Sequence, residues 1–91
     1  MKGDKSEQRK VTIMITVRFI WHEIDDTDCL DDEDFQNLQQ AIDALPGTLQ
    51  GCVESVVSLD LYLFPAGLDY DHDSPSQVSL SNLQYVDSIS R

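Results

Sequence analysis

The stretch VTIMITVRFIW, residues 11–21, decides the fold class because its apolar residues alternate along the chain. Thr12, Thr16 and Arg18 lie between them, and His22 follows in the same polar phase. A period of two residues is typical of a β-strand with one buried face. We therefore expect a long strand from Lys10 to Trp21. Its inward side chains would be Val11, Ile13, Ile15, Val17, Phe19 and Trp21.

The residues before this strand are polar and include four of the six cations, Lys2, Lys5, Arg9 and Lys10. We expect residues 1–10 to be a flexible tail and residues 11–91 to be a single small domain. An apolar fraction of 41% is too high for a disordered chain. No segment has the length of a membrane span and no signal-peptide cleavage site follows the apolar stretch, so we expect a cytoplasmic protein without membrane partners.

The segment after the strand, HEIDDTDCLDDEDF at 22–35, is strongly acidic and contains no Lys or Arg. Its second half, DDEDF, predicts the start of a helix, with Asp31 as the N-cap and the next acids near the positive end of the helix dipole. Apolar residues then recur at helical spacing, and Pro46-Gly47 is expected to end the helix. These apolar residues are Phe35, Leu38, Ala41, Ile42 and Leu45.

Two further strands are expected in the second half of the chain. Residues 52–64 alternate, with Val53, Val57, Leu59, Leu61 and Leu63 predicted to face inward. Residues 77–89 predict a third strand with a β-bulge near Ser81-Asn82, and a short C-terminal helix is the alternative. The expected fold is α+β in the order β-α-β-β: a small antiparallel or mixed sheet of about three strands with one amphipathic helix on one face. Its exposed strand edges would permit a homodimer.

The charge of the chain is unevenly distributed. The net charge is -11, and no Lys or Arg occurs from Phe19 to Ser90. Such a surface repels nucleic acids and acidic membranes, so the expected partner is a basic protein and not nucleic acid itself.

Metal binding and catalysis find little support in the sequence. DYDHDS at 69–74 spaces Asp69, Asp71 and Asp73 as in a calcium loop, but Ser74 replaces the turn glycine and Leu80 the bidentate glutamate. We expect no metal and no cofactor, with weak calcium binding as an alternative. His22 and His72 are interpreted as surface histidines, and Cys29 and Cys52 as unpaired thiols. The chain contains no phosphate-binding glycine loop and no nucleophile motif, so we do not expect an enzyme.

Helix capping accounts for only part of the acidic run, and the part before Leu30 has no such structural reason. If residues 23–34 were helical, with ~1.5 Å rise per residue, their charge density would approach that of duplex DNA, whereas an extended segment would carry about half or less. Our leading hypothesis is a small interaction module that binds and inhibits a basic nucleic-acid-binding protein. The candidate partner-binding residues are Glu23, Asp25, Asp26, Asp28, Asp31, Asp32, Glu33, Asp34, Asp69, Asp71 and Asp73.

In size, charge and depletion of cations, the chain is similar to DNA-mimic inhibitors, among them phage anti-restriction and anti-CRISPR proteins and inhibitors of DNA-repair glycosylases. No motif of these proteins is matched. The negative charge also has two alternative origins. One is adaptation of the whole surface to high salt, and the second is an assembly protein that pairs through a strand edge and uses its acids for solubility.

Overall fold

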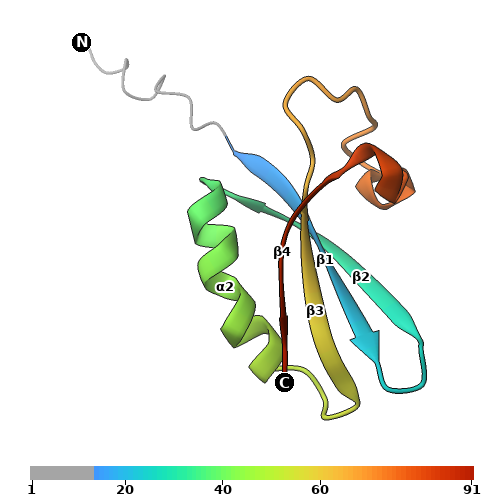
Figure 1. Ribbon diagram of the computed structural model, residues 1–91. Coiled ribbons are helices and arrows are strands. Elements are labelled where there is room, and N and C mark those ends of the chain that lie inside the picture. Colours follow the sequence, from blue (N-terminus) through green and yellow to red (C-terminus); the bar gives the residue numbers. More distant parts are fainter. Residues whose placement is uncertain (1–13) are drawn as a thin grey trace.

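The computed structural model describes residues 14–91, which form a four-stranded antiparallel sheet with one α-helix on one face (Figure 1). The strands are β1 (Ile15–Glu23), β2 (Asp28–Phe35), β3 (Val56–Leu63) and β4 (Gln84–Ser90), and the helix is α2 (Leu38–Gln50). Their order across the sheet is β2-β1-β3-β4. The predicted α+β class is confirmed, with four strands where about three were expected. The predicted tail, residues 1–10, and residues 11–13 lie outside the described residues.

The alternation in β1 builds the core as expected. Val17 and Phe19 are buried on the face that carries α2, and Ile15 and Trp21 are partly buried around them. The helix and β3 complete this core, which consists of Val17, Phe19, Ala41, Leu45, Leu49, Val56, Leu59 and Leu61, and Val86 and Ile89 of β4 pack against it. A two-layer sandwich of sheet and helix results.

The acidic run does not start a helix, and that prediction was wrong. Residues 28–35 form β2, which pairs antiparallel with β1 from His22↔Asp28 to Ile15↔Phe35. The run lacks an apolar alternation because β2 lies at the sheet edge and most of its side chains are exposed. Its backbone is held by the ladder to β1, so acidic side chains are tolerated although their strand propensity is low.

Helix α2 starts and ends later than predicted. Its N-cap is Asn37, whose side chain accepts a hydrogen bond from the Gln40 amide. Pro46 lies inside the helix, which continues to Gln50. Proline cannot donate a backbone hydrogen bond inside a helix. The burial of Leu49 in the core, one turn later, offsets this loss of stability. The Arg91 guanidinium also donates to the carbonyl of Leu49 at 2.8 Å.

Strand β3 is shorter than the predicted strand of residues 52–64. Residues 52–55 form the turn after α2, so Val53 is exposed and not inward. A register shift against β1 at His22/Glu23 brings Val56 inward, and Val57 is exposed in consequence. The predicted inward positions of Leu59 and Leu61 are confirmed, because both are fully buried.

The last strand also differs from the prediction. Residues 75–82 contain two 3-10 turns, η1 (Pro75–Gln77) and η2 (Leu80–Asn82), and β4 begins only at Gln84. The phase change that suggested a bulge near Ser81-Asn82 arises from these turns. A real register shift occurs later, where Leu61↔Asp87 is followed by Tyr62↔Tyr85 and Val86 is the extra residue. The alternative of a C-terminal helix is wrong.

The sheet face opposite α2 is also covered, although β1 was expected to bury only one face. The loop that follows β3 folds back over this face together with η1 and η2 (Figure 1). Ile20 is buried there, and Arg18 is only 2% exposed. We call this loop, residues 64–83, the covering loop.

Arg18 fastens the covering loop to the sheet. Its Nε donates to Asp32 Oδ1 at 2.8 Å and its Nη2 donates to Asp32 Oδ2 at 3.3 Å. This bidentate ion pair joins β1 to β2. Nη1 and Nη2 also donate to the carbonyls of Val78 and Pro75, at 2.9 and 2.8 Å. The guanidinium carbon lies 5.3 Å from the ring centre of Phe64, within cation–π range.

We predict that Arg18→Leu destabilises the protein by ~3–5 kcal/mol, because it leaves the buried Asp32 carboxylate without a cation and two carbonyls without a donor. Urea unfolding measures the change. Arg91→Leu is the control, since it removes the same charge from an exposed residue whose hydrogen bonds are worth about 1 kcal/mol. Equal losses of stability in the two variants would contradict this role of Arg18.

Candidate functional site

The acidic run becomes an exposed edge strand. We call the five carboxylates of β2 the acidic edge: Asp28, Asp31, Asp32, Glu33 and Asp34. Because side chains alternate along a strand, they divide between the two faces of the sheet. The register places Asp28, Asp32 and Asp34 beside His22, Arg18 and Thr16, on the face of the covering loop. Asp31 and Glu33 lie on the face that carries α2.

The carboxylates on the face of the covering loop each have a cross-strand partner. Asp32 pairs with Arg18 and has a side chain only 5% exposed, so it serves the fold. Asp34 accepts a hydrogen bond from the Thr16 hydroxyl at 2.8 Å and stays exposed. Asp28 pairs with His22 Nδ1 at 2.7 Å.

On the other face, Asp31 and Glu33 are neighbours, and no cation within residues 14–91 pairs with either of them. Both are exposed, two residues apart on the same side of β2. The pKa of Glu33 is raised, first by partial burial and then by the hydrogen bond and negative charge of Asp31. A raised carboxyl pKa means that ionised Glu33 is disfavoured in the folded state. Ionised Glu33 therefore costs stability at neutral pH.

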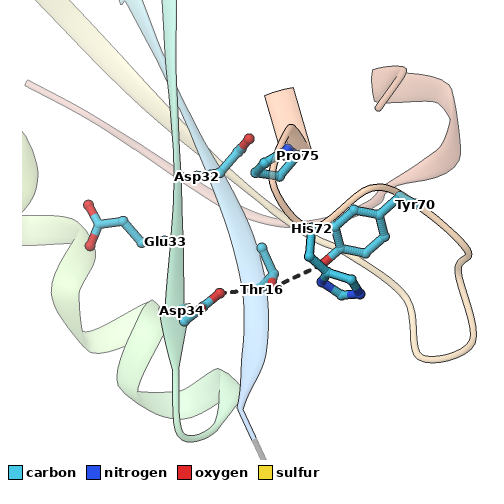
Figure 2. A pocket seen from close by; sticks show the side chains of 7 residues that line it. All are labelled: Thr16, Asp32, Glu33, Asp34, Tyr70, His72 and Pro75. Carbon is cyan, nitrogen blue, oxygen red and sulfur yellow. Dashed lines mark hydrogen bonds between the residues drawn. The ribbon is translucent and has the colours of Figure 1, made fainter. Parts of the chain in front are cut away.

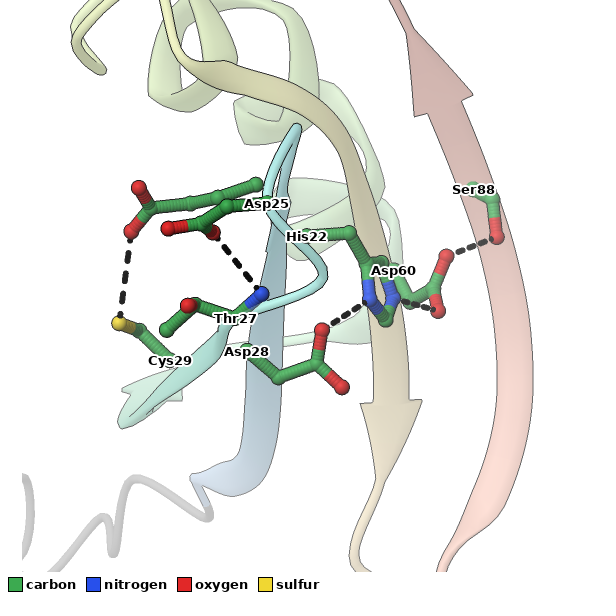
Figure 3. Close-up of polar contacts among 8 residues, drawn as sticks. His22, Asp25, Thr27, Asp28, Cys29, Asp60 and Ser88 are labelled. Atoms are coloured by element: carbon green, nitrogen blue, oxygen red, sulfur yellow. Dashed lines mark hydrogen bonds and ion pairs between the residues drawn. The ribbon is translucent and has the colours of Figure 1, made fainter.

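The residues before Leu30, for which the sequence showed no structural reason, do have local roles (Figure 3). Hydrogen bonds from the Thr27 hydroxyl and amide hold the pKa of Asp25 below its ordinary value, so Asp25 shapes the β1–β2 turn. Asp26 occupies the left-handed region of the same turn, with φ of 68°. Glu23 accepts a hydrogen bond from the Ser55 hydroxyl at 3.2 Å.

His22 is not an ordinary surface histidine. Its Nε2 lies 2.6 Å from Asp60 Oδ2 on β3, while Nδ1 contacts Asp28 on β2. Asp60 in turn accepts from the Ser88 hydroxyl on β4 at 2.6 Å, so one polar chain crosses all four strands (Figure 3). Ser88 contacts the aspartate and not the histidine, so the order of groups is not that of a nucleophilic triad.

The second acidic segment lies beside the acidic edge at Asp34. Tyr70 lies between Asp69 and Asp71 in the sequence. Its hydroxyl donates to Thr16 Oγ1 at 3.2 Å, and Thr16 donates to Asp34 (Figure 2). A cavity of about 210 Å³ opens between β2 and the covering loop. Its lining consists of Thr16, Asp32, Glu33, Asp34, Tyr70, His72 and Pro75. Thr16, Tyr70 and His72 were not predicted as site residues, because hydroxyl and aromatic residues do not stand out by charge.

The three aspartates of the second segment do not converge. The Asp71 carboxylate accepts the amide of Asp73 at 2.9 Å, which is a turn-forming contact. Within residues 14–91, no three His, Cys, Asp or Glu side chains are grouped so that they could hold a metal ion. Cys29 and Cys52 are both free thiols.

Comparison of the chain with protein-family models, with curated proteins and with solved structures found no match. Among the described residues, no helix combines the length and apolar character needed to cross a membrane.

We predict that His22 makes stability depend on pH. Its pKa is raised above 6.5, first by the hydrogen bond to Asp60, because the protonated ring lies between two carboxylates. The stabilisation is therefore complete below about pH 6.5 and is lost as the pH rises through the folded-state pKa. Urea unfolding from about pH 5 to about pH 8 should show this fall in wild type.

The variant His22→Gln, which cannot be protonated, is the control for this pH series. It should have a flatter dependence over the same range. Parallel pH profiles for wild type and variant would contradict the role of the His22 contacts.

Proposed function

We propose that this protein is a small acidic interaction module that binds a basic nucleic-acid-binding protein and blocks its nucleic-acid site. The observation that carries the proposal is the exposed pair Asp31 and Glu33 on β2. These carboxylates have no cationic partner within residues 14–91, and Asp31 adds to the cost of ionising Glu33. Lys or Arg side chains of a partner would relieve that cost.

The spacing of charge fits one strand of nucleic acid better than a duplex. At ~3.3 Å rise per residue, the four carboxylates of β2 that remain beside the Arg18-paired Asp32 span about 20 Å from Asp28 to Asp34, or about 5–7 Å per charge. A nucleic-acid strand carries one charge per about 3.4 Å and a duplex one per about 1.7 Å. The duplex density considered for a compact helical segment does not apply, because the segment is extended. A groove that tracks a single phosphate backbone is the favoured target.

The edge position of β2 favours a basic partner over a second copy of this chain. Pairing of β2 with itself would align two strands that each carry five carboxylates, and like charges opposite one another are destabilising. A strand or loop rich in Lys and Arg would instead place opposite charges beside β2, which gives fast association that depends on salt.

The proposal predicts that basic nucleic-acid-binding proteins bind the chain in titrations at low salt, that affinity falls as salt rises, and that single-stranded DNA competes. The double variant Asp31→Asn/Glu33→Gln should bind about two- to thirtyfold more weakly, at ~0.2–1 kcal/mol for each lost exposed ion pair. The same variant should be more stable than wild type, because the repulsion at Glu33 is removed.

Asp43→Asn/Asp87→Asn is the matched control, because it makes the same change in net charge on α2 and β4. It should leave binding nearly unchanged. General adaptation to salt predicts instead that the two double variants behave alike, and that result, or binding indifferent to salt, would refute the proposal.

A further inference from the structure

The cavity between β2 and the covering loop joins a carboxylate to an aromatic ring. The two acidic segments contribute one wall each, with Asp32 and Asp34 from β2 and Tyr70 and His72 from the loop. In Figure 2 both aspartates project toward the loop, whereas Glu33 projects to the other side of the strand. At about 210 Å³ the cavity is smaller than the ~300–1,000 Å³ of sites for drug-sized ligands. It suits the end of one long side chain.

The neighbouring Arg18 shows how this part of the fold holds a guanidinium. Arg18 is bound by the Asp32 carboxylate and lies over the Phe64 ring. The cavity offers the same two kinds of group, a carboxylate and an aromatic ring, further along the strand. Asp34 follows Asp32 on the same face of β2, about 7 Å away at the rise of a strand. The Tyr70 ring lies 5.0 Å from the Phe64 ring, centre to centre.

The groups of the cavity are held in place by contacts of their own. Thr16 donates to Asp34 and accepts from the Tyr70 hydroxyl, so one hydroxyl fixes both the carboxylate and the ring. The His72 ring packs on the Tyr70 ring at 4.3 Å between centres. Asp34 remains exposed and can accept further hydrogen bonds. Preorganised groups lower the entropy cost of binding.

We propose that this cavity binds the guanidinium of an arginine side chain presented by the basic partner. The inference rests on the proposed function, since it names the side chain that the site would receive. Arginine fits better than lysine, because its planar head can stack on Tyr70 while its N–H groups reach the Asp34 carboxylate. The lysine ammonium is a compact, strongly hydrated charge and lacks the stacking plane.

The experiment is an NMR titration of the full chain with N-acetyl-arginine methylamide. The amide signals of Thr16, Asp34, Tyr70 and His72 should shift along one saturable curve. The lysine analogue should bind more weakly, and the neutral isostere N-acetyl-citrulline methylamide should produce no saturable shift. Asp34→Asn should weaken arginine binding by about fivefold, whereas Asp87→Asn, with the same loss of charge on β4, should leave it unchanged.

Three results would overturn the inference. The first is equal weakening by Asp34→Asn and Asp87→Asn, and the second is an equal response to arginine and citrulline. The third is arginine binding that appears only in the variant Arg9→Gln/Lys10→Gln, because the cavity would then receive a side chain of this same chain.

The inference and the proposed function can fail separately. If basic proteins still bind in a salt-dependent way while Asp34→Asn has no effect, the cavity inference fails and the proposed function stands. If arginine saturates the cavity but no basic protein binds, the proposed function fails, and the assignment of the arginine to a partner fails with it.

Discussion

The buried guanidinium of Arg18 is the group on which one whole face of the sheet depends. Its ion pair with Asp32 joins β1 to the edge strand β2, and its hydrogen bonds to Pro75 and Val78 hold the covering loop in place. Burying an unpaired charge is costly, so the geometry of all three segments is coupled through this residue. The same coupling brings Tyr70 beside Asp34. The candidate site therefore depends on one cation that joins the acidic edge to the covering loop.

The acids of the chain separate into those that the fold uses and those that it leaves free. Asp32, Asp28 and Asp60 have cationic or titratable partners, and Asp25 shapes a turn. Burial and the neighbouring Asp31 make ionised Glu33 unfavourable, and Asp34 is held in an exposed position by a hydroxyl. Residues that cost stability without serving the fold are the best candidates for binding. This division differs from the sequence-based one, which found no structural reason for the acids before Leu30.

How well each element could be predicted depended on the kind of pattern that it leaves in the sequence. β1 was predicted correctly because its buried side chains alternate along the chain. The inward positions of Leu59 and Leu61 were predicted for the same reason. β2 was not, because an edge strand is defined by hydrogen bonds to its neighbour and needs no apolar pattern of its own. The end of the helix was wrongly predicted at Pro46-Gly47, because the burial of Leu49 outweighs the local preference of proline to break a helix. The acids of the site were found by charge, whereas Thr16 and Tyr70 became relevant only through tertiary contacts.

The role of the acidic edge as a binding surface is tested most directly by amide hydrogen exchange of the whole chain, measured free and in complex with a basic nucleic-acid-binding protein. We expect slower exchange in β2 and its turn, residues 24–35, and around Tyr70 in the covering loop. Exchange in β4, which lies at the far edge of the sheet from β2, should change little. Slower exchange confined to α2 and β4, with β2 unaffected, would contradict the claim that the acidic edge is the binding surface.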